Sequence, residues 1–450
     1  MPHSSSSASL KQQLEYAALQ YEPKEDQRMF SSSPLTLERY SSEQRDVSID
    51  PDTRISGISS PRLQYPCTNW AYTPAWLPGD APGHRKFIAL DEYPLENGGS
   101  LPHAYLAYET WGQLNDDASN AVLILHALTA DSHVCGSQSQ NHPTAGWWNS
   151  LVGSKKVIDT DRYFVVAPNC LGGCQGSTGP AWPAPDGLPW GSRFPSITIR
   201  DQVKAENQLR LQLGISSWNL VIGPSAGGFR ACEWACMFAQ QVRSLVLIAT
   251  AESMSADQIA WAHMQIYAQD LDPSFAGGDY YLSQDKNAGN QGMALARQIA
   301  HATYRSTDEF NTRFGRQLQP SEKPSVDERY AVESYLEYHG EKLSKRFDPG
   351  SYRVLTRAMM SHDIGRGRGG TRRAAQSITA RTLIIGVDSD RLFPACECAK
   401  LAQYIPCASY REVTSYAGHD GFLIETSHIE KILEEFCAHT ASITATAGDR

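Results

Sequence analysis

The sequence predicts an α/β fold in which a mostly parallel sheet is interrupted by a helical insertion. Several apolar runs have the continuous hydrophobic character of parallel strands that are covered on both faces: "NAVLILHAL", "RYFVVAPN", "WNLVIG", "SLVLIAT" and "TLIIGV". Stretches with apolar residues at three- and four-residue spacing separate some of these runs and indicate amphipathic helices, as in "TIRDQVKAENQLRLQLGI". Strands that alternate with helices are typical of a parallel α/β sheet.

The alternation stops between residues 251 and 366, where helical patterns such as "SADQIAWAHMQIYAQ" follow one another without a buried strand. We interpret this segment as a helical lid that is inserted between two strands of the sheet. The core is then expected in two parts, at residues 67–250 and 367–440. The serine-rich residues 1–66 are predicted to form a flexible extension, and residues 441–450 a C-terminal tail.

Composition narrows the class of function. The chain has 450 residues and a net charge of −9, so nothing in its overall charge favours nucleic acid or an anionic membrane as a partner. No stretch approaches the roughly 20 uninterrupted apolar residues of a membrane-spanning helix. The 10 cysteines are scattered, and none has the partners at the spacing that a zinc site needs. We therefore expect reduced thiols and no metal.

The beginning of the chain bears on its location. "MPHSSSSASLKQQLEY" lacks the apolar core of a secretory signal peptide. A mitochondrial leader is poor in acidic residues, whereas Glu15, Glu22, Glu25 and Asp26 lie near the start. A cytoplasmic location is therefore expected, with mitochondrial import as the disfavoured alternative.

Ser225 is the candidate nucleophile. Residues 223–227 read G-P-S-A-G, which fits the pattern G-x-S-x-G. An apolar strand pattern precedes the motif and an amphipathic helix pattern follows it, which is the context of a nucleophile elbow. At such a turn the serine hydroxyl projects from the sheet, and the helix N-terminus favours negative charge beside it.

A serine hydroxyl becomes a strong nucleophile when a base takes its proton and an acid orients that base. In this architecture the order along the chain is serine, acid, histidine. His419, in "VTSYAGHDGFLIE", lies in a predicted loop after a strand and is the candidate base. Asp388 and Asp390 both follow the strand "TLIIGV", and the residues alone leave the choice between these two acids open.

The oxyanion that forms during acyl transfer needs two backbone N–H donors. Ala226, which follows the nucleophile, is expected to provide one, and Leu128, at the end of an earlier strand, the other. His126 and His133 flank this strand end without the spacing or the nearby carboxylates of a metal site. We expect them to pack or to form hydrogen bonds.

Several long motifs, in this order, resemble those of the homoserine O-acetyltransferases: "HALTADSHV", "GWWNSLVGSKKVIDTDRYFVVAPNCLGGCQGSTGP", "FPSITIRDQV", "HDIGRGRGG", "SDRLFP" and "GHDGFLIE". The similarity runs from about residue 105 to residue 425. It implies an α/β-hydrolase fold and a place in methionine biosynthesis. It also implies ping-pong transfer of an acetyl group from acetyl-CoA, a co-substrate and not a bound cofactor, to the hydroxyl of L-homoserine.

The resemblance assigns further residues. It selects Asp390, in "SDRLFP", as the acid of the triad. It also points to Arg297 and Tyr304, in "ALARQIAHATYR", as ligands of the amino acid's carboxylate, and to Asp420 as the ligand of its ammonium group. Members of the family are often dimers that meet through the lid, which implies a homodimer here.

The elbow departs from the family pattern. The family has G-G-S-M-G-G, whereas residues 223–228 read G-P-S-A-G-G, so the side chain beside the acyl group is smaller. A larger donor such as succinyl-CoA is therefore an alternative. Because relatives acylate L-serine or secondary metabolites, these acceptors are alternatives to homoserine, and a plain esterase or thioesterase is a further one.

Overall fold

The computed structural model describes residues 73–139, 141–142, 144–319 and 328–447, and the side chains of residues up to 438. The predicted extension at residues 1–66 lies outside these residues. The main sheet has eight strands in the order β1-β2-β6-β3-β7-β8-β9-β10. Their bounds are Lys86–Pro94 (β1), Ser100–Trp111 (β2), Ala121–Ile124 (β3), Phe164–Pro168 (β6), Leu220–Pro224 (β7), Ser244–Ile248 (β8), Arg381–Val387 (β9) and Ala408–Val413 (β10).

The mostly parallel character of the sheet is confirmed. All neighbours from β6 to β10 run parallel, while β1 and β2 form an antiparallel pair and β2 is antiparallel to β6. The apolar runs quoted above form β3, β6, β7, β8 and β9. A separate two-stranded sheet pairs Val152–Gly153 (β4) with Ile158–Asp159 (β5).

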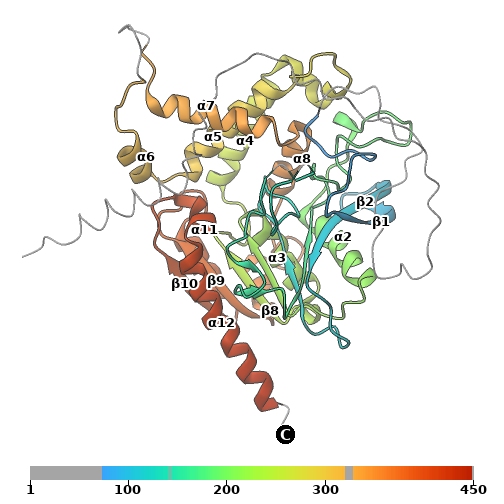
Figure 1. Cartoon of the computed structure of the whole chain (residues 1–450), viewed down its shortest axis with the longest axis vertical. Coiled ribbons are helices and arrows are strands. Elements are labelled where there is room, and N and C mark those ends of the chain that lie inside the picture. The colour runs from blue at the N-terminus through green and yellow to red at the C-terminus, as the bar shows by residue number, and fades with distance from the viewer. Residues whose placement is uncertain (1–72, 140, 143, 320–327, 448–450) are drawn as a thin grey trace, which may run out of the picture. The chain divides into compact units, whose positions relative to one another are not determined.

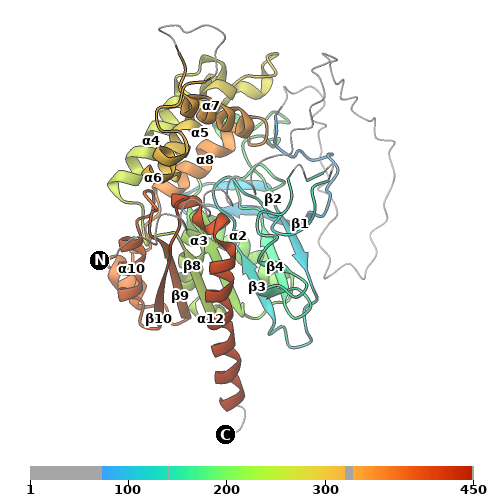
Figure 2. The same cartoon turned by 60° about the vertical axis from the view of Figure 1, so that its left-hand side comes forward.

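Successive residues of the central strands face two different layers, because side chains alternate along a strand. In β8, Leu245 and Leu247 pack in a cluster with the helices α2 (Ile199–Gln212) and α3 (Ala226–Met237), whereas Val246 and Ile248 pack on the opposite face with α12 (Thr426–Ala447). Figures 1 and 2 show these helices on either side of the sheet. The bounds of the core helices are Ile199–Gln212 (α2), Ala226–Met237 (α3), Thr371–Gln376 (α9), Ala395–Tyr404 (α10), Gly421–Ile424 (α11) and Thr426–Ala447 (α12).

The lid helices lie in the chain between β8 and β9. They are Ala256–Asp270 (α4), Asn290–Tyr304 (α5), Thr307–Arg313 (α6), Ala331–Ser344 (α7) and Pro349–Met360 (α8). In both ribbon views these helices gather at one end of the sheet (Figures 1 and 2). They fall within the expected insertion, while the exact domain boundaries stay a prediction.

A buried carboxylate organises the base of the lid. Asp348 is fully buried and caps α8 by accepting a hydrogen bond from the N–H of Ser351 at 2.8 Å. It also accepts hydrogen bonds from the hydroxyls of Tyr280 at 2.5 Å and Tyr281 at 2.8 Å. The Thr73 hydroxyl, at the start of the described chain, adds another at 2.9 Å. These donors satisfy a charge that would be costly to bury alone, and they fasten the lid to the start of the fold.

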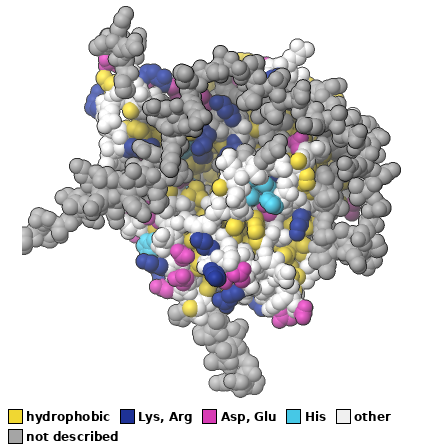
Figure 3. Space-filling model, viewed as in Figure 1, with side chains coloured by type: hydrophobic (Ala, Val, Ile, Leu, Met, Phe, Trp, Pro, Cys, Tyr) yellow, Lys and Arg dark blue, Asp and Glu magenta, His cyan; other side chains and the backbone are white. Residues whose placement is uncertain are grey.

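No helix among the described residues is both long enough and apolar enough to cross a bilayer. On the face seen in Figure 3, basic and acidic side chains lie close to one another at the lower end of the described surface, whereas basic side chains predominate near its upper centre. The absence of a nucleic-acid partner stays a prediction.

Candidate active site

Ser225 occupies a strained turn between β7 and α3. Its backbone has φ = 53° and ψ = −124°, a region that non-glycine residues rarely adopt outside functional sites. The flanking glycines permit this turn. A Cβ atom on Gly227 would lie 1.9 Å from the carbonyl oxygen of Leu125, and one on Gly223 would lie 2.2 Å from the oxygen of Gly227. The motif G-x-S-x-G therefore meets a steric requirement of the turn.

The structure brings Ser225, His419 and Asp390 together. Nε2 of His419 lies 2.8 Å from Oγ of Ser225, and Nδ1 lies 2.7 Å from Oδ2 of Asp390. The other carboxylate oxygen of Asp390 accepts the N–H groups of Leu392 at 2.8 Å and Phe393 at 2.9 Å. With its proton on Nδ1, His419 can accept the proton of the serine hydroxyl.

The geometry separates the two candidate acids. Asp388 is exposed, and its Oδ1 accepts the N–H of Ser415 at 3.0 Å. Asp390 is only 5% exposed and contacts the histidine. The two acids are only two residues apart in the loop after β9, yet Asp388 points toward the backbone of Ser415 and Asp390 points toward His419.

The surroundings of His419 raise its pKa. Burial alone lowers the pKa of the imidazole, but the attraction and hydrogen bond of Asp390 outweigh burial, and Asp420 adds to the attraction, so the net pKa lies above 6.5. A raised pKa makes His419 a stronger base toward the serine hydroxyl.

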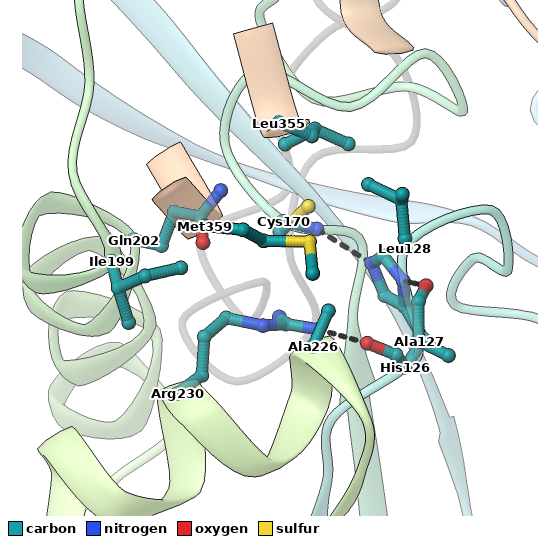
Figure 4. Close-up of a pocket in the computed structure, with 10 residues that line it drawn as sticks. All are labelled: His126, Ala127, Leu128, Cys170, Ile199, Gln202, Ala226, Arg230, Leu355 and Met359. Carbon is teal, nitrogen blue, oxygen red and sulfur yellow. Dashed lines mark hydrogen bonds between the residues drawn. The ribbon is translucent and has the colours of Figure 1, made fainter. Parts of the chain in front are cut away.

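Ala226 and Leu128 lie beside each other. Ala226 is the first residue of α3, so its N–H is one of those that lack a partner within the helix. Leu128 lies in the loop after β3, and both residues line one small cavity (Figure 4). This arrangement is compatible with a shared oxyanion site, and the assignment of the two donors stays a prediction.

His126 and His133 do not lie in one cluster. His126 uses both ring nitrogens in hydrogen bonds: Nε2 accepts the N–H of Cys170 at 3.0 Å and Nδ1 lies 2.8 Å from the oxygen of Ala127. Burial, together with the charge of Arg230, lowers its pKa to about 3. His126 is therefore a neutral side chain that ties two loops together.

His133 belongs instead to a buried group that the sequence did not reveal. Its Nδ1 lies 2.9 Å from Oε2 of Glu109, and its ring stacks on that of His142 with 4.0 Å between centroids. Glu109, His133 and His142 are close enough for their ligand atoms to hold a metal ion. The expectation of no metal stays a prediction, and this cluster is the place at which to test it.

Arg297 and Tyr304 extend from α5 toward the candidate catalytic residues. The ring centroid of Tyr304 lies 5.5 Å from that of His419, and the Arg297 guanidinium lies 5.2 Å from the Tyr304 ring. Nη1 of Arg297 is buried and has no hydrogen-bond partner among the described residues. A buried cationic donor without a partner is costly, so this position is suited to an anionic ligand.

Asp420 already has a protein partner. Its Oδ2 lies 3.1 Å from Nη2 of Arg305, and that arginine also contacts Glu309 at 3.2 Å. If Asp420 binds the ammonium group of the substrate as predicted, its carboxylate must contact that group and Arg305 at the same time. The pattern that identified Tyr304 gave no indication of Arg305, the next residue, because its partner Asp420 is remote in sequence.

Arg346 is a second residue that the sequence reasoning missed. Its Nη2 donates a hydrogen bond of 2.8 Å to the backbone oxygen of Thr129, directly after Leu128. The lid thus holds the loop that carries one of the predicted oxyanion donors.

Known proteins share this architecture. The alpha/beta hydrolase fold family matches residues 120–426. The homoserine O-acetyltransferase of Thermobifida fusca (strain YX) is 54% identical over 368 residues, which cover 81% of this chain and 97% of that protein. The crystal structure of the Bacillus anthracis homoserine O-acetyltransferase superposes with a TM-score of 0.72 at 27% identity, covering 78% of this chain and 96% of that one.

The structure of esterase E22 is similar to the same degree, with a TM-score of 0.72, 25% identity and coverage of 78% of this chain and 99% of that one. The fold alone is thus shared by esterases and transferases. The much higher sequence identity to the T. fusca enzyme separates them: this chain is an acyltransferase of the α/β-hydrolase fold and belongs to the homoserine O-acetyltransferase family.

Proposed function

We propose that this enzyme transfers an acetyl group from acetyl-CoA to the side-chain hydroxyl of L-homoserine, as a step in methionine biosynthesis and without a bound cofactor. The observation that carries the proposal is the hydrogen-bonded chain from Ser225 through His419 to Asp390, with distances of 2.8 and 2.7 Å, in a member of this family. A cytoplasmic homodimer belongs to the same proposal.

In the first half of the reaction, His419 accepts the proton of Ser225 while the serine oxygen attacks the thioester carbonyl. The N–H groups of Leu128 and Ala226 stabilise the oxyanion, and each such donor is worth about 3–4 kcal/mol of barrier. The carbon–sulfur bond breaks, His419 returns the proton to the leaving thiolate, and an acetyl ester remains on Ser225.

In the second half, homoserine enters in place of CoA. Its α-carboxylate pairs with Arg297, whose guanidinium can bind a carboxylate through two N–H groups, and Tyr304 donates to the same group. Asp420 is the proposed ligand of the ammonium group. His419 takes the proton of the homoserine hydroxyl, the ester is transferred, and Ser225 recovers its proton.

Hydrolysis is the competing outcome, since water can replace homoserine in the second half. The similarity to esterase E22 supports this alternative. Arg297 argues for the transferase. Its Nη1 is buried and has no partner in the described part of the chain, which an anionic acceptor explains, whereas the hydrolysis of a simple ester needs no such cation.

The test measures the release of CoA thiol from acetyl-CoA with L-homoserine, L-serine or water alone as the acceptor. Release that depends on L-homoserine supports the proposal, release that depends on L-serine changes the acceptor, and equal release in water replaces the transferase with an esterase. Arg297→Met should raise KM for homoserine by about 10- to 100-fold, as expected for a charged hydrogen-bonded pair. Arg357→Met, which removes an exposed arginine from α8, is the matched control.

A further inference from the structure

The junction between the lid helices α5 and α6 lies against the turn that carries the candidate base. This turn is the short helix η6 (Gly418–Asp420), and both ribbon views place α6 beside the segment that leads into α11 (Figures 1 and 2). The packing is close. A Cβ atom on Gly418, where φ is +64°, would lie 2.3 Å from the backbone oxygen of Tyr304 and 2.8 Å from the nitrogen of Ser306. The junction and the turn therefore meet backbone against backbone.

Arg305 is the buried residue at the centre of this junction, with 8% of its surface exposed. Its Nη2 lies 3.1 Å from Oδ2 of Asp420, the residue after His419, and its Nη1 donates to Oε1 of Glu309 in α6 at 3.2 Å. Burial lowers the pKa of Arg305, but the attraction of Asp420, with further contributions from Tyr335 and Glu309, outweighs burial and raises that pKa. Arg305 is therefore a permanent cation that joins the lid to the turn of the base.

Ser306 provides a second link on the other side of the base. Its hydroxyl donates a hydrogen bond of 2.5 Å to the backbone oxygen of Tyr416, three residues before His419. The same oxygen accepts the N–H of Glu309 at 3.0 Å and so caps α6. Two consecutive lid residues thus hold the chain before and after the candidate base.

The charge beside His419 depends on one of these links. Among the described residues, the side chains that face the imidazole are those of Ser225, Tyr304, Asp390, Phe393, Asp420 and Phe422. Asp420 contributes to the raised pKa of His419, and a cation paired with Asp420 opposes that contribution. Without Arg305, the attraction of Asp420 would act in full.

We propose that Arg305 is a positioning residue for catalysis, which holds the turn of His419 through Asp420 and moderates the negative charge beside the base. This inference rests on the proposed function. Arg305 acts through Asp420 and not on the reacting atoms. Because His419 accepts the proton of Ser225 before homoserine enters, the effect should already be present in the first half of the reaction. A role confined to orienting Asp420 toward the acceptor would change only the second half.

The first experiment mixes the enzyme rapidly with excess acetyl-CoA, without an acceptor, and follows the burst of CoA thiol from the first turnover. Arg305→Met should slow this burst by about 10- to 100-fold, as expected for the loss of a charged hydrogen-bonded pair. Arg313→Met is the matched control, since Arg313 is 51% exposed and contacts the same Glu309 at 3.6 Å. It should leave the burst rate within about twofold of the parent enzyme.

Two outcomes of the burst experiment separate the inference from the proposed function. Equal burst rates in the parent enzyme and in Arg305→Met would overturn the role of Arg305 while leaving the transferase intact. If the parent enzyme itself gave no burst and no release dependent on homoserine, the proposed function would fail.

The second experiment measures the pH profile of kcat/KM for acetyl-CoA. Arg305→Met should move the acid limb to higher pH by about 0.5–1 unit, because the pKa of His419 rises when Asp420 loses its cation. The position of this limb does not depend on how much of the enzyme is folded, so a merely structural role would not move it. Arg305→Lys keeps the charge but lacks the fork that contacts Asp420 and Glu309 together. Its acid limb should coincide with that of the parent enzyme, while its burst rate stays below the parent value. A shift in Arg305→Lys as large as that in Arg305→Met would contradict the inference.

Discussion

Two buried groups in this molecule combine a serine, a histidine and a carboxylate, and they are connected differently. In the first, His419 joins Ser225 at Nε2 and Asp390 at Nδ1. In the second, His133 and Ser132 both contact the carboxylate of Glu109, at 2.9 Å each. The second serine is thus bound to the acid and not to the base.

The difference shows what a buried histidine–carboxylate pair lacks when it stands alone. No side-chain hydroxyl among the described residues forms a hydrogen bond with Nε2 of His133, so no hydroxyl is placed to give up its proton. Ser225 also lies on a strained turn at the N-terminus of a helix, where negative charge is favoured. Nucleophilic chemistry therefore depends on which group contacts Nε2 of the histidine and on the backbone turn that carries the serine.

The largest predicted effect comes from removing the nucleophile. Ser225→Ala should lower kcat for CoA release by about 10⁵- to 10⁶-fold, as expected when one member of a triad is lost. Ser132→Ala removes the corresponding hydroxyl of the second group and should leave kcat within a few-fold of the parent enzyme. Equal losses in the two variants would mean that the catalytic roles have been assigned to the wrong group.

The acids give the next comparison. Asp390→Asn should lower kcat by about 10⁴-fold, because an amide no longer holds the imidazole in the productive tautomer. Glu109→Gln changes a carboxylate that is equally buried and should affect kcat only slightly.

The variant Glu109→Gln, which should change kcat only slightly, should have a clear effect on stability. Glu109→Gln should lower the free energy of unfolding by about 1–3 kcal/mol, since it weakens a buried hydrogen-bonded pair. Burial lowers the pKa of His133, but the hydrogen bond and charge of Glu109 outweigh burial and raise it. The charge contribution is therefore fully present below pH 6.5 and is lost as the pH rises through the higher folded pKa. Urea unfolding across this range checks both the size and the direction.

The pH dependence of activity distinguishes the two histidines by a smaller effect. Because Asp390 raises the pKa of His419 above 6.5, kcat/KM should fall about tenfold per pH unit below that raised pKa, where the base is protonated. His133→Gln should leave this acid limb in place. If His133→Gln shifted the acid limb of the kcat/KM profile, His133 and not His419 would be the catalytic base.

The fold was predictable because central parallel strands are apolar along their whole length. The runs quoted from the sequence form β3, β6, β7, β8 and β9. The helices that cover these strands were predictable as well, because their apolar residues recur at three- and four-residue spacing.

The site was only partly predictable. The order of Ser225 and His419 along the chain and the glycines of the elbow are local signals, and the structure places these two side chains in contact. The residues alone did not separate Asp388 from Asp390, because the direction of a side chain in a loop is set by tertiary contacts. For the same reason three pairings gave no signal, since their partners are remote in sequence: Arg305 with Asp420, Arg346 with Thr129, and Glu109 with His133.

The last prediction concerns the cluster of Glu109, His133 and His142, which we expect not to bind a metal ion. His133 and His142 stack at 4.0 Å with an interplanar angle of 17°, whereas a metal ion lies near the plane of each imidazole that binds it. Two nearly parallel stacked rings cannot both direct a lone pair at one ion. In addition, Nε2 of His142 already accepts the N–H of His84 at 3.1 Å.

Zinc alone, added to the enzyme after treatment with a chelator, should therefore leave both activity and Tm unchanged. A site filled at 100 times its Kd would stabilise the fold by about 2.7 kcal/mol, which a thermal unfolding experiment detects easily. His142→Gln separates this cluster from the exposed thiols of Cys396 and Cys407, because it removes a ligand without changing them. A zinc-dependent rise in Tm that disappears in His142→Gln would show that the rings rearrange to bind the ion. The cluster of Glu109, His133 and His142 would then be a metal site.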